Sequence, residues 1–150
     1  MIHTRIIVVK NPDEMGVKAA DQFEAMIQSK PACVIGLATG STPIGTYKNL
    51  IEWYKSGDLD FSRVKSVNLD EYVGLEPTHD QSYRYFMQTN LFDHINIDPA
   101  NTNVPNGMAE DPEAACAQRR RAGIHRQQLA PDALGVLARL AGALEELAGA

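Results

Sequence analysis

Residues 33–43 read Cys-Val-Ile-Gly-Leu-Ala-Thr-Gly-Ser-Thr-Pro, and this stretch decides the fold class. It begins with a run of apolar and small residues, a pattern typical of a short strand that is buried on both faces of a sheet. Proline is favoured in the first turn of a helix, so we expect a helix from Pro43 to Ser56 that ends at Gly57. The stretch therefore predicts a strand, a short loop and a helix in immediate succession.

The loop inside this stretch has the composition of an anion-binding turn. Gly40 allows a backbone conformation that other residues rarely adopt, and Ser41 and Thr42 fall at the N-terminus of the predicted helix. Free N–H groups, the helix dipole and two hydroxyls converge there, which suits a phosphate group. Serine and threonine are also the usual N-cap residues, so a plain helix cap is the alternative interpretation.

Strand and helix patterns alternate along the chain. Ile6–Val9 is a β-branched run that predicts another buried strand, and Asn11 is placed to cap the helix that follows it. A third strand is expected over Val64–Leu69, and Asp80 is placed to cap a further helix. This order predicts an α/β fold with a doubly wound, mainly parallel sheet and helices on both faces, incomplete at its C-terminal end. Ligands of such sheets bind beyond the carboxyl ends of the strands.

Two carboxylates follow the predicted strand that ends at Leu69. Asp70 and Glu71 are adjacent, and neighbouring side chains of an extended backbone point to opposite faces, so only one is expected to face a cleft. A carboxylate at the mouth of a partly apolar pocket can act as a general base toward a carbon acid. Tyr72 and Tyr83 are candidates for the wall of a sugar site. A solvated loop and ordinary core aromatics are the alternatives.

The composition limits the classes of partner. The chain has 150 residues, of which 44% are apolar, and a net charge of -5, which favours one globular domain and argues against nucleic-acid and membrane partners. Cys33 and Cys116 belong to no CxxC pair, and the histidines share no metal-ligand spacing, so we expect reduced thiols and no metal site. No N-terminal apolar run reaches signal-peptide or membrane-span length, which predicts a cytoplasmic protein.

The character of the sequence changes near residue 119. Three arginines at 119–121 lead into a segment rich in Ala, Leu, Gly and Arg, in which Ala133–Leu147 fits an amphipathic helix. We therefore expect an α/β domain over residues 1–118 and a divergent helical tail over residues 119–150 that carries no identifiable chemistry.

Five motifs in the first part of the chain form a recognisable set. They are Gly36-Leu-Ala-Thr-Gly-Ser-Thr-Pro43, the pair Tyr47-Lys48, Asn68-Leu-Asp-Glu-Tyr-Val-Gly-Leu75, elements of the stretch from Ser82 to His94, and Pro105-Asn106-Gly107. Together they resemble the N-terminal half of the glucosamine-6-phosphate deaminases, in the glucosamine/galactosamine-6-phosphate isomerase family. The resemblance covers roughly residues 1–118.

The resemblance implies an aldose–ketose isomerisation with loss of ammonia, which converts glucosamine 6-phosphate to fructose 6-phosphate in amino-sugar catabolism. Asp70 matches the family's base, which moves the C2 proton to C1 of the opened sugar, and Glu71 is a second catalytic candidate. The family's phosphate-binding positions are matched by Thr39, Gly40, Ser41 and Thr42. No metal or organic cofactor is implied; the partner is a small-molecule sugar phosphate, and a homo-oligomer stays open.

The sequence departs from the family pattern after Gln118. It lacks the Asp-Gly-His and Asn-Glu-Pro motifs, which carry the ring-opening histidine and its carboxylate partners in the family, and His125 has neither context. We therefore expect a truncated or altered deaminase that is inactive or weak as it stands. Two alternatives stay open: a 6-phosphogluconolactonase-like hydrolase, which the segment Asp70–Leu75 disfavours, and a non-catalytic sugar-phosphate-binding module.

Overall fold

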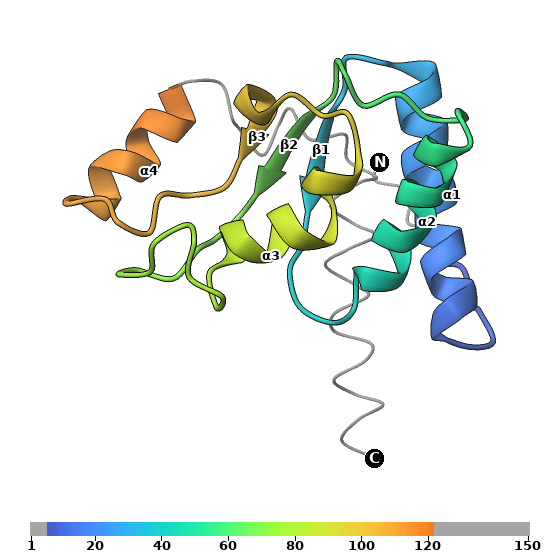
Figure 1. Cartoon of the computed structure of the whole chain (residues 1–150), viewed down its shortest axis with the longest axis horizontal. Helices are drawn as coiled ribbons and strands as arrows, with labels where there is room; N and C mark the ends of the chain where they lie inside the picture. Colours follow the sequence, from blue (N-terminus) through green and yellow to red (C-terminus); the bar gives the residue numbers. More distant parts are fainter. Residues whose placement is uncertain (1–5, 122–150) are drawn as a thin grey trace.

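A short parallel sheet lies at the centre of the computed structural model, which describes residues 6–121 (Figure 1). Its strands, in the order β1-β2-β3, are Val34–Leu37, Lys65–Asn68 and Thr102–Asn103. β1 and β2 pair in a register that sets Leu37 opposite Asn68. The carboxyl ends of these two strands therefore lie side by side, and the loops that follow them begin at the same edge of the sheet.

Helices connect and flank the strands. α1 (Pro12–Ser29) and α2 (Ile44–Lys55) pack side by side, whereas α3 (Tyr83–Asn90) crosses in front of the sheet beside α2 (Figure 1). Two short 3-10 helices, Phe92–His94 and Pro99–Asn101, precede β3, and α4 (Pro112–Arg121) lies beyond it. No helix among residues 6–121 is long and apolar enough to cross a membrane.

The hydrophobic core forms between the sheet and the first three helices. Its members include Phe23 and Ile27 of α1, Ile35 and Leu37 of β1, Tyr47 and Leu50 of α2, Phe61, and Met87 of α3. Burial of each large apolar side chain contributes about 1.5–3 kcal/mol to folding. The free thiol of Cys33 is part of this core, and burial raises its pKa.

The structure confirms the predicted α/β fold class and most of the predicted elements. The strands expected over residues 33–37 and Val64–Leu69 are β1 and β2, and the helix expected from Pro43 is α2, each with slightly shorter bounds. Gly57 has a φ of 88°, which explains why α2 stops just before it. β3 was not predicted, because the pair Thr102–Asn103 lacks the apolar pattern of a buried strand.

The predicted strand over Ile6–Val9 is wrong for the described structure. These residues form no strand, and the side chains of Ile6 and Val8 are 82% and 91% exposed. β-branched residues favour extended backbone, but a strand also needs a neighbour to pair with, and neither β1, β2 nor β3 pairs with this segment. The predicted helix over Ala133–Leu147 and His125 lie outside the described residues.

The backbones of α1 and α2 come into contact at Gly16 and Gly45. A Cβ atom on Gly16 would lie 2.9 Å from the carbonyl carbon of Gly45, whereas a Cβ on Gly45 would meet nothing closer than 3.7 Å. The two glycines therefore differ sharply in their tolerance of a side chain.

We predict that Gly16→Ala lowers the free energy of unfolding by about 1–3 kcal/mol, because overpacking outweighs the gain in helix propensity. Gly45→Ala is the matched control and should be neutral or slightly stabilising. Urea unfolding followed by circular dichroism measures both. Equal midpoints for the two variants would contradict the close approach of the helices.

Candidate functional site

The loop after β1 carries the four predicted phosphate-binding residues. Gly40 adopts a φ of 91°, which explains the glycine, and Ser41 is exposed while Thr42 is half-buried. Neither hydroxyl caps α2: its N-cap residue is Pro43, and no side chain in the described part of the chain caps this helix. The plain-cap interpretation of Ser41 and Thr42 is therefore wrong, and the first turn of α2 is left without a side-chain acceptor.

The hydroxyl of Tyr47 holds the start of this loop. It accepts a hydrogen bond from the Ala38 N–H at 3.0 Å and donates one to the Ala38 carbonyl at 2.6 Å. Burial raises the pKa of Tyr47, and the hydrogen bond with Ala38 acts in the opposite direction. Sequence reasoning placed Tyr47 only on a helix, because the residue that it contacts lies on another element.

The loop after β2 begins from a strand end that is tied to β1. The side-chain amide of Asn68 donates to the Leu37 carbonyl at 3.0 Å, in the buried interior. The side chains of Leu69 and Asp70, which follow, are exposed. Asp70 therefore stands at the sheet edge where the β1 loop also begins.

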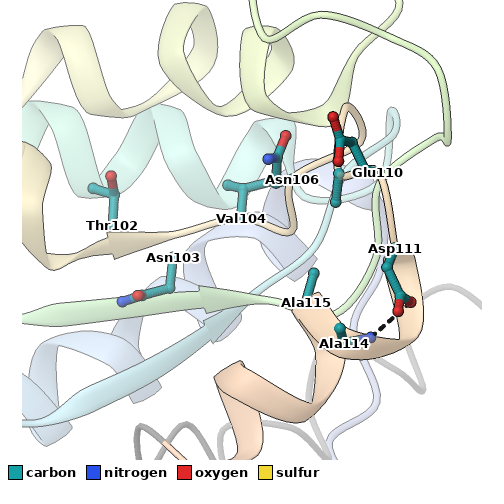
Figure 2. Close-up of a pocket in the computed structure, with 9 residues that line it drawn as sticks. Thr102, Asn103, Val104, Asn106, Glu110, Asp111, Ala114 and Ala115 are labelled. Carbon is teal, nitrogen blue, oxygen red and sulfur yellow. Dashed lines mark hydrogen bonds between the residues drawn. The ribbon is translucent and has the colours of Figure 1, made fainter.

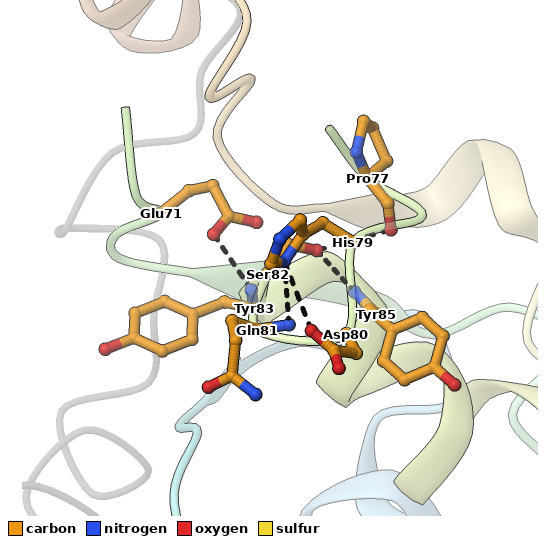
Figure 3. Close-up of polar contacts among 8 residues, drawn as sticks. All are labelled: Glu71, Pro77, His79, Asp80, Gln81, Ser82, Tyr83 and Tyr85. Atoms are coloured by element: carbon orange, nitrogen blue, oxygen red, sulfur yellow. Dashed lines mark hydrogen bonds and ion pairs between the residues drawn. The ribbon is translucent and has the colours of Figure 1, made fainter. Parts of the chain in front are cut away.

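Glu71 has a different environment from its neighbour Asp70. Its Oε1 accepts hydrogen bonds from the backbone N–H of Tyr83 at 2.8 Å (Figure 3) and from that of Tyr72 at 2.9 Å. Its Oε2 accepts one from the Arg84 N–H at 2.9 Å. Glu71 thus adds a second cap to the N-terminus of α3. The catalytic role of Glu71 stays a prediction, but both of its carboxylate oxygens accept hydrogen bonds from backbone N–H groups.

Asp80 does not cap α3, contrary to the prediction. The N-cap residue is Ser82, whose Oγ accepts from the Tyr85 N–H at 3.0 Å (Figure 3). Asp80 is exposed in the preceding turn, with Oδ1 3.3 Å from Nδ1 of His79. The chain turns twice between residues 77 and 82, which moves the helix start two residues past the expected position.

Two tyrosines join the β2 loop to the first turn of α3. The hydroxyl of Tyr83 donates to that of Tyr72 at 3.2 Å, and their ring centroids are 4.8 Å apart. This hydrogen bond is the main reason that the pKa of Tyr83 is raised; partial burial and the charge of Asp70 act in the same direction, whereas a hydrogen bond with Thr39 lowers it. Tyr72 and Tyr83, two residues that the sequence singled out, thus lie in contact.

An open cavity of about 460 Å³ lies elsewhere, between β3 and α4 (Figure 2). Its walls include Asn103 and Val104 on one side, and Glu110, Asp111 and Ala114 on the other. Asp111 caps α4 by accepting from the Ala114 N–H at 3.0 Å. None of the predicted site residues lines this cavity, and two carboxylates at its wall oppose the binding of a phosphate.

The arrangement at the ends of β1 and β2 offers hydroxyl donors, an exposed carboxylate and an uncapped helix N-terminus. Such groups can bind an anion and move a proton on a neighbouring carbon. Among residues 6–121, no three His, Cys, Asp or Glu side chains converge to hold a metal ion.

The parallel sheet with its flanking helices defines a Rossmann-like α/β domain with its candidate site at adjacent strand ends. Residues 11–134 match the family model described as glucosamine-6-phosphate isomerases/6-phosphogluconolactonase. The chain belongs to this family.

Curated relatives agree with this assignment. The glucosamine-6-phosphate deaminase of Clostridium perfringens (strain SM101 / Type A) is 62% identical over 112 residues, which cover 75% of this chain and 46% of the relative. That of Lachnoclostridium phytofermentans is 61% identical over 112 residues, covering 75% and 48%. The chain spans about half the length of the curated relatives that it matches.

Solved structures share the fold. A monomeric glucosamine-6-phosphate deaminase superposes with a TM-score of 0.77 at 37% identity, covering 79% of this chain and 49% of that one. A 6-phosphogluconolactonase from Thermotoga maritima gives a TM-score of 0.63 at 19% identity, covering 80% and 54%, and this likeness concerns the fold alone. The lactonases are therefore the more distant branch of the family for this chain.

Tyr47 provides a test of how the β1 loop is held. We predict that Tyr47→Phe lowers the free energy of unfolding by about 1–3 kcal/mol, because both backbone groups of Ala38 lose a partner in a half-buried position. Tyr54→Phe is the matched control, since the Tyr54 hydroxyl has no hydrogen bond within the described ranges, and it should change stability by less than about 0.5 kcal/mol. Urea unfolding of both variants decides the point, and equal losses would contradict a specific role for the Tyr47 hydroxyl.

Proposed function

We propose that this chain binds glucosamine 6-phosphate and that Asp70 acts as the carbon base of an isomerisation that releases ammonia. The observation that supports it best is the parallel register of β1 and β2, which starts the loop that carries Thr39–Thr42 and the loop that carries Asp70 from the same edge of the sheet. The loop assigned to the phosphate and the carboxylate assigned to the base thus leave the sheet side by side. The names of the curated relatives point to the same substrate.

The phosphate is assigned to the β1 loop. Ser41 and Thr42 offer hydroxyls next to the N-terminus of α2, where the helix dipole favours negative charge. Gly40 suits this turn because its φ of 91° is a backbone conformation that residues with a side chain rarely adopt. A dianionic group binds here through local dipoles although the chain as a whole is acidic.

The base is assigned to Asp70 because Glu71 is occupied by backbone N–H groups. In the opened sugar, the C1 carbonyl acidifies the C2–H bond, and Asp70 accepts this proton and returns it to C1. A proton of the amine passes to O1, which leaves an imine at C2. Water then adds to the imine, and the collapse of the adduct forms the C2 carbonyl and releases ammonia.

The wall of the sugar site is assigned to Tyr72 and Tyr83, whose hydroxyls can bind those of the sugar. No group among residues 6–121 is assigned to ring opening. We therefore expect proton exchange on the open-chain fraction of the sugar and slow release of ammonia.

The phosphate assignment predicts a selective loss of binding. Thr42→Val removes one hydroxyl at nearly constant volume and should weaken glucosamine 6-phosphate binding by about 1.5–3 kcal/mol, the contribution of a charge-assisted hydrogen bond. Binding of unphosphorylated glucosamine should hardly change, and Thr78→Val, in an exposed turn, is the control. Calorimetry that shows equal losses for both sugars would rule out Thr42 as a phosphate ligand.

The base assignment predicts a loss of chemistry without a loss of binding. Asp70→Asn should slow exchange of the C2 proton with deuterated solvent by about 10²–10⁴-fold, because the amide cannot accept the proton. Proton NMR of glucosamine 6-phosphate follows the exchange, and calorimetry follows its binding. Asp80→Asn, also exposed, is the control. Binding of the sugar phosphate without any exchange by the unmodified chain would indicate the non-catalytic binding module instead.

A further inference from the structure

Glu71 joins the β2 loop to a helix that begins twelve residues later in the sequence. Its two oxygens accept from the N–H groups of Tyr83 and Arg84, both in the first turn of α3. The Oγ atom of Ser82 accepts a hydrogen bond from the next backbone N–H group, that of Tyr85 (Figure 3). The Glu71 side chain is therefore a charged second cap, and the positive end of the helix dipole favours its negative charge.

α3 is itself fixed to the rest of the domain. Arg84 donates from Nη1 to Oγ1 of Thr102 on β3 at 2.8 Å, and its guanidinium carbon lies 5.7 Å from the ring centroid of Phe92. Met87 and Leu91 lie fully buried in the core below. Glu71 thus ties the β2 loop to an element that packing already holds in place.

The β2 loop also contacts the turn Pro105-Asn106-Gly107. The Gly74 N–H donates to the Gly107 carbonyl at 2.8 Å. A Cβ on Gly107 would lie 2.2 Å from the carbonyl oxygen of Tyr72 and 3.2 Å from Cγ of Glu71, so only glycine fits against the loop at this point. The backbone that follows Asp70 is therefore held both by this turn and by the N-terminus of α3.

We propose that Glu71 is a positioning residue: by fixing the β2 loop to α3, its carboxylate holds Asp70 and Tyr72 in the orientation that the reaction needs. This inference rests on the proposed function. Asp70 is exposed and precedes Glu71 directly, so the anchor sets the direction in which the neighbouring carboxylate points. Tyr72 follows Glu71 and reaches the Tyr83 hydroxyl at 3.2 Å only while the loop stays against α3.

The first test needs no substrate and uses the 150-residue chain. In ¹⁵N–¹H spectra, Glu71→Gln should shift the amide resonances of Tyr83 and Arg84 upfield, because a neutral acceptor replaces a carboxylate. Glu71→Ala should also lower the raised pKa of the Tyr83 hydroxyl toward its ordinary value, because the hydroxyl of Tyr72 moves away. Absorbance at alkaline pH follows this titration. Glu76→Gln, an exposed glutamate in the same loop, is the matched control and should leave both signals in place.

The second test measures the consequence for the chemistry. Glu71→Ala should slow C2 proton exchange of glucosamine 6-phosphate by about 10-fold or more while changing its affinity by less than about threefold, since misplacement of a catalytic group mainly affects the chemical step. Glu71→Gln keeps one acceptor oxygen and should restore part of the rate. This conservative variant also covers the case in which Glu71→Ala fails to fold.

The outcomes separate the inference from the proposed function. If the unmodified chain exchanges no proton, the proposed function fails, and the amide and phenol signals alone decide whether Glu71 holds the loop. Unchanged amide and phenol signals in the Glu71 variants would overturn the anchor. Equal losses of rate and affinity in Glu71→Ala would overturn the positioning role, because they would indicate a direct contact with the ligand.

Discussion

The parallel pairing of β1 with β2 is the constraint on which the candidate site depends. Its register sets Leu37 opposite Asn68, and the buried amide of Asn68 bonds to the Leu37 carbonyl, so neither strand end can slide past the other. Both following loops consequently start from one edge of the sheet. Thr39 and Asp70, about thirty positions apart in the sequence, therefore lie on loops that leave the sheet side by side, as the proposed site requires.

Residues that hold the site differ from those that face it. Tyr47 is fully buried and fixes the β1 loop through the backbone of Ala38, while Glu71 fixes the β2 loop through the first turn of α3. Asp70 and Ser41 remain exposed. The division follows from energetics: a buried or bonded polar group rigidifies the backbone, whereas a group that binds ligand must stay accessible until the ligand arrives.

The amino-acid pattern was sufficient to predict the local structure around the site. The apolar run at 33–37, the glycine at 40 and the proline at 43 predicted β1, its loop and α2, because burial, backbone freedom and helix initiation are properties of neighbouring residues. The pattern of the β2 strand likewise placed Asp70 at its end. It could not choose between Asp70 and Glu71 on physical grounds, since both follow the strand.

Contacts across the fold decided the rest. Ile6–Val9 has the composition of a strand but no partner strand among residues 6–121, and the pair Thr102–Asn103 has little strand character but lies beside β2 and pairs with it. Glu71 became a helix cap because the chain folds back and brings Tyr83 within 2.8 Å of it. Sequence by itself determined where β1, α2, β2 and the reactive side chains stand along the chain. Only the tertiary structure decided which of them meet, because strand pairing and long-range hydrogen bonds depend on distances that no local pattern records.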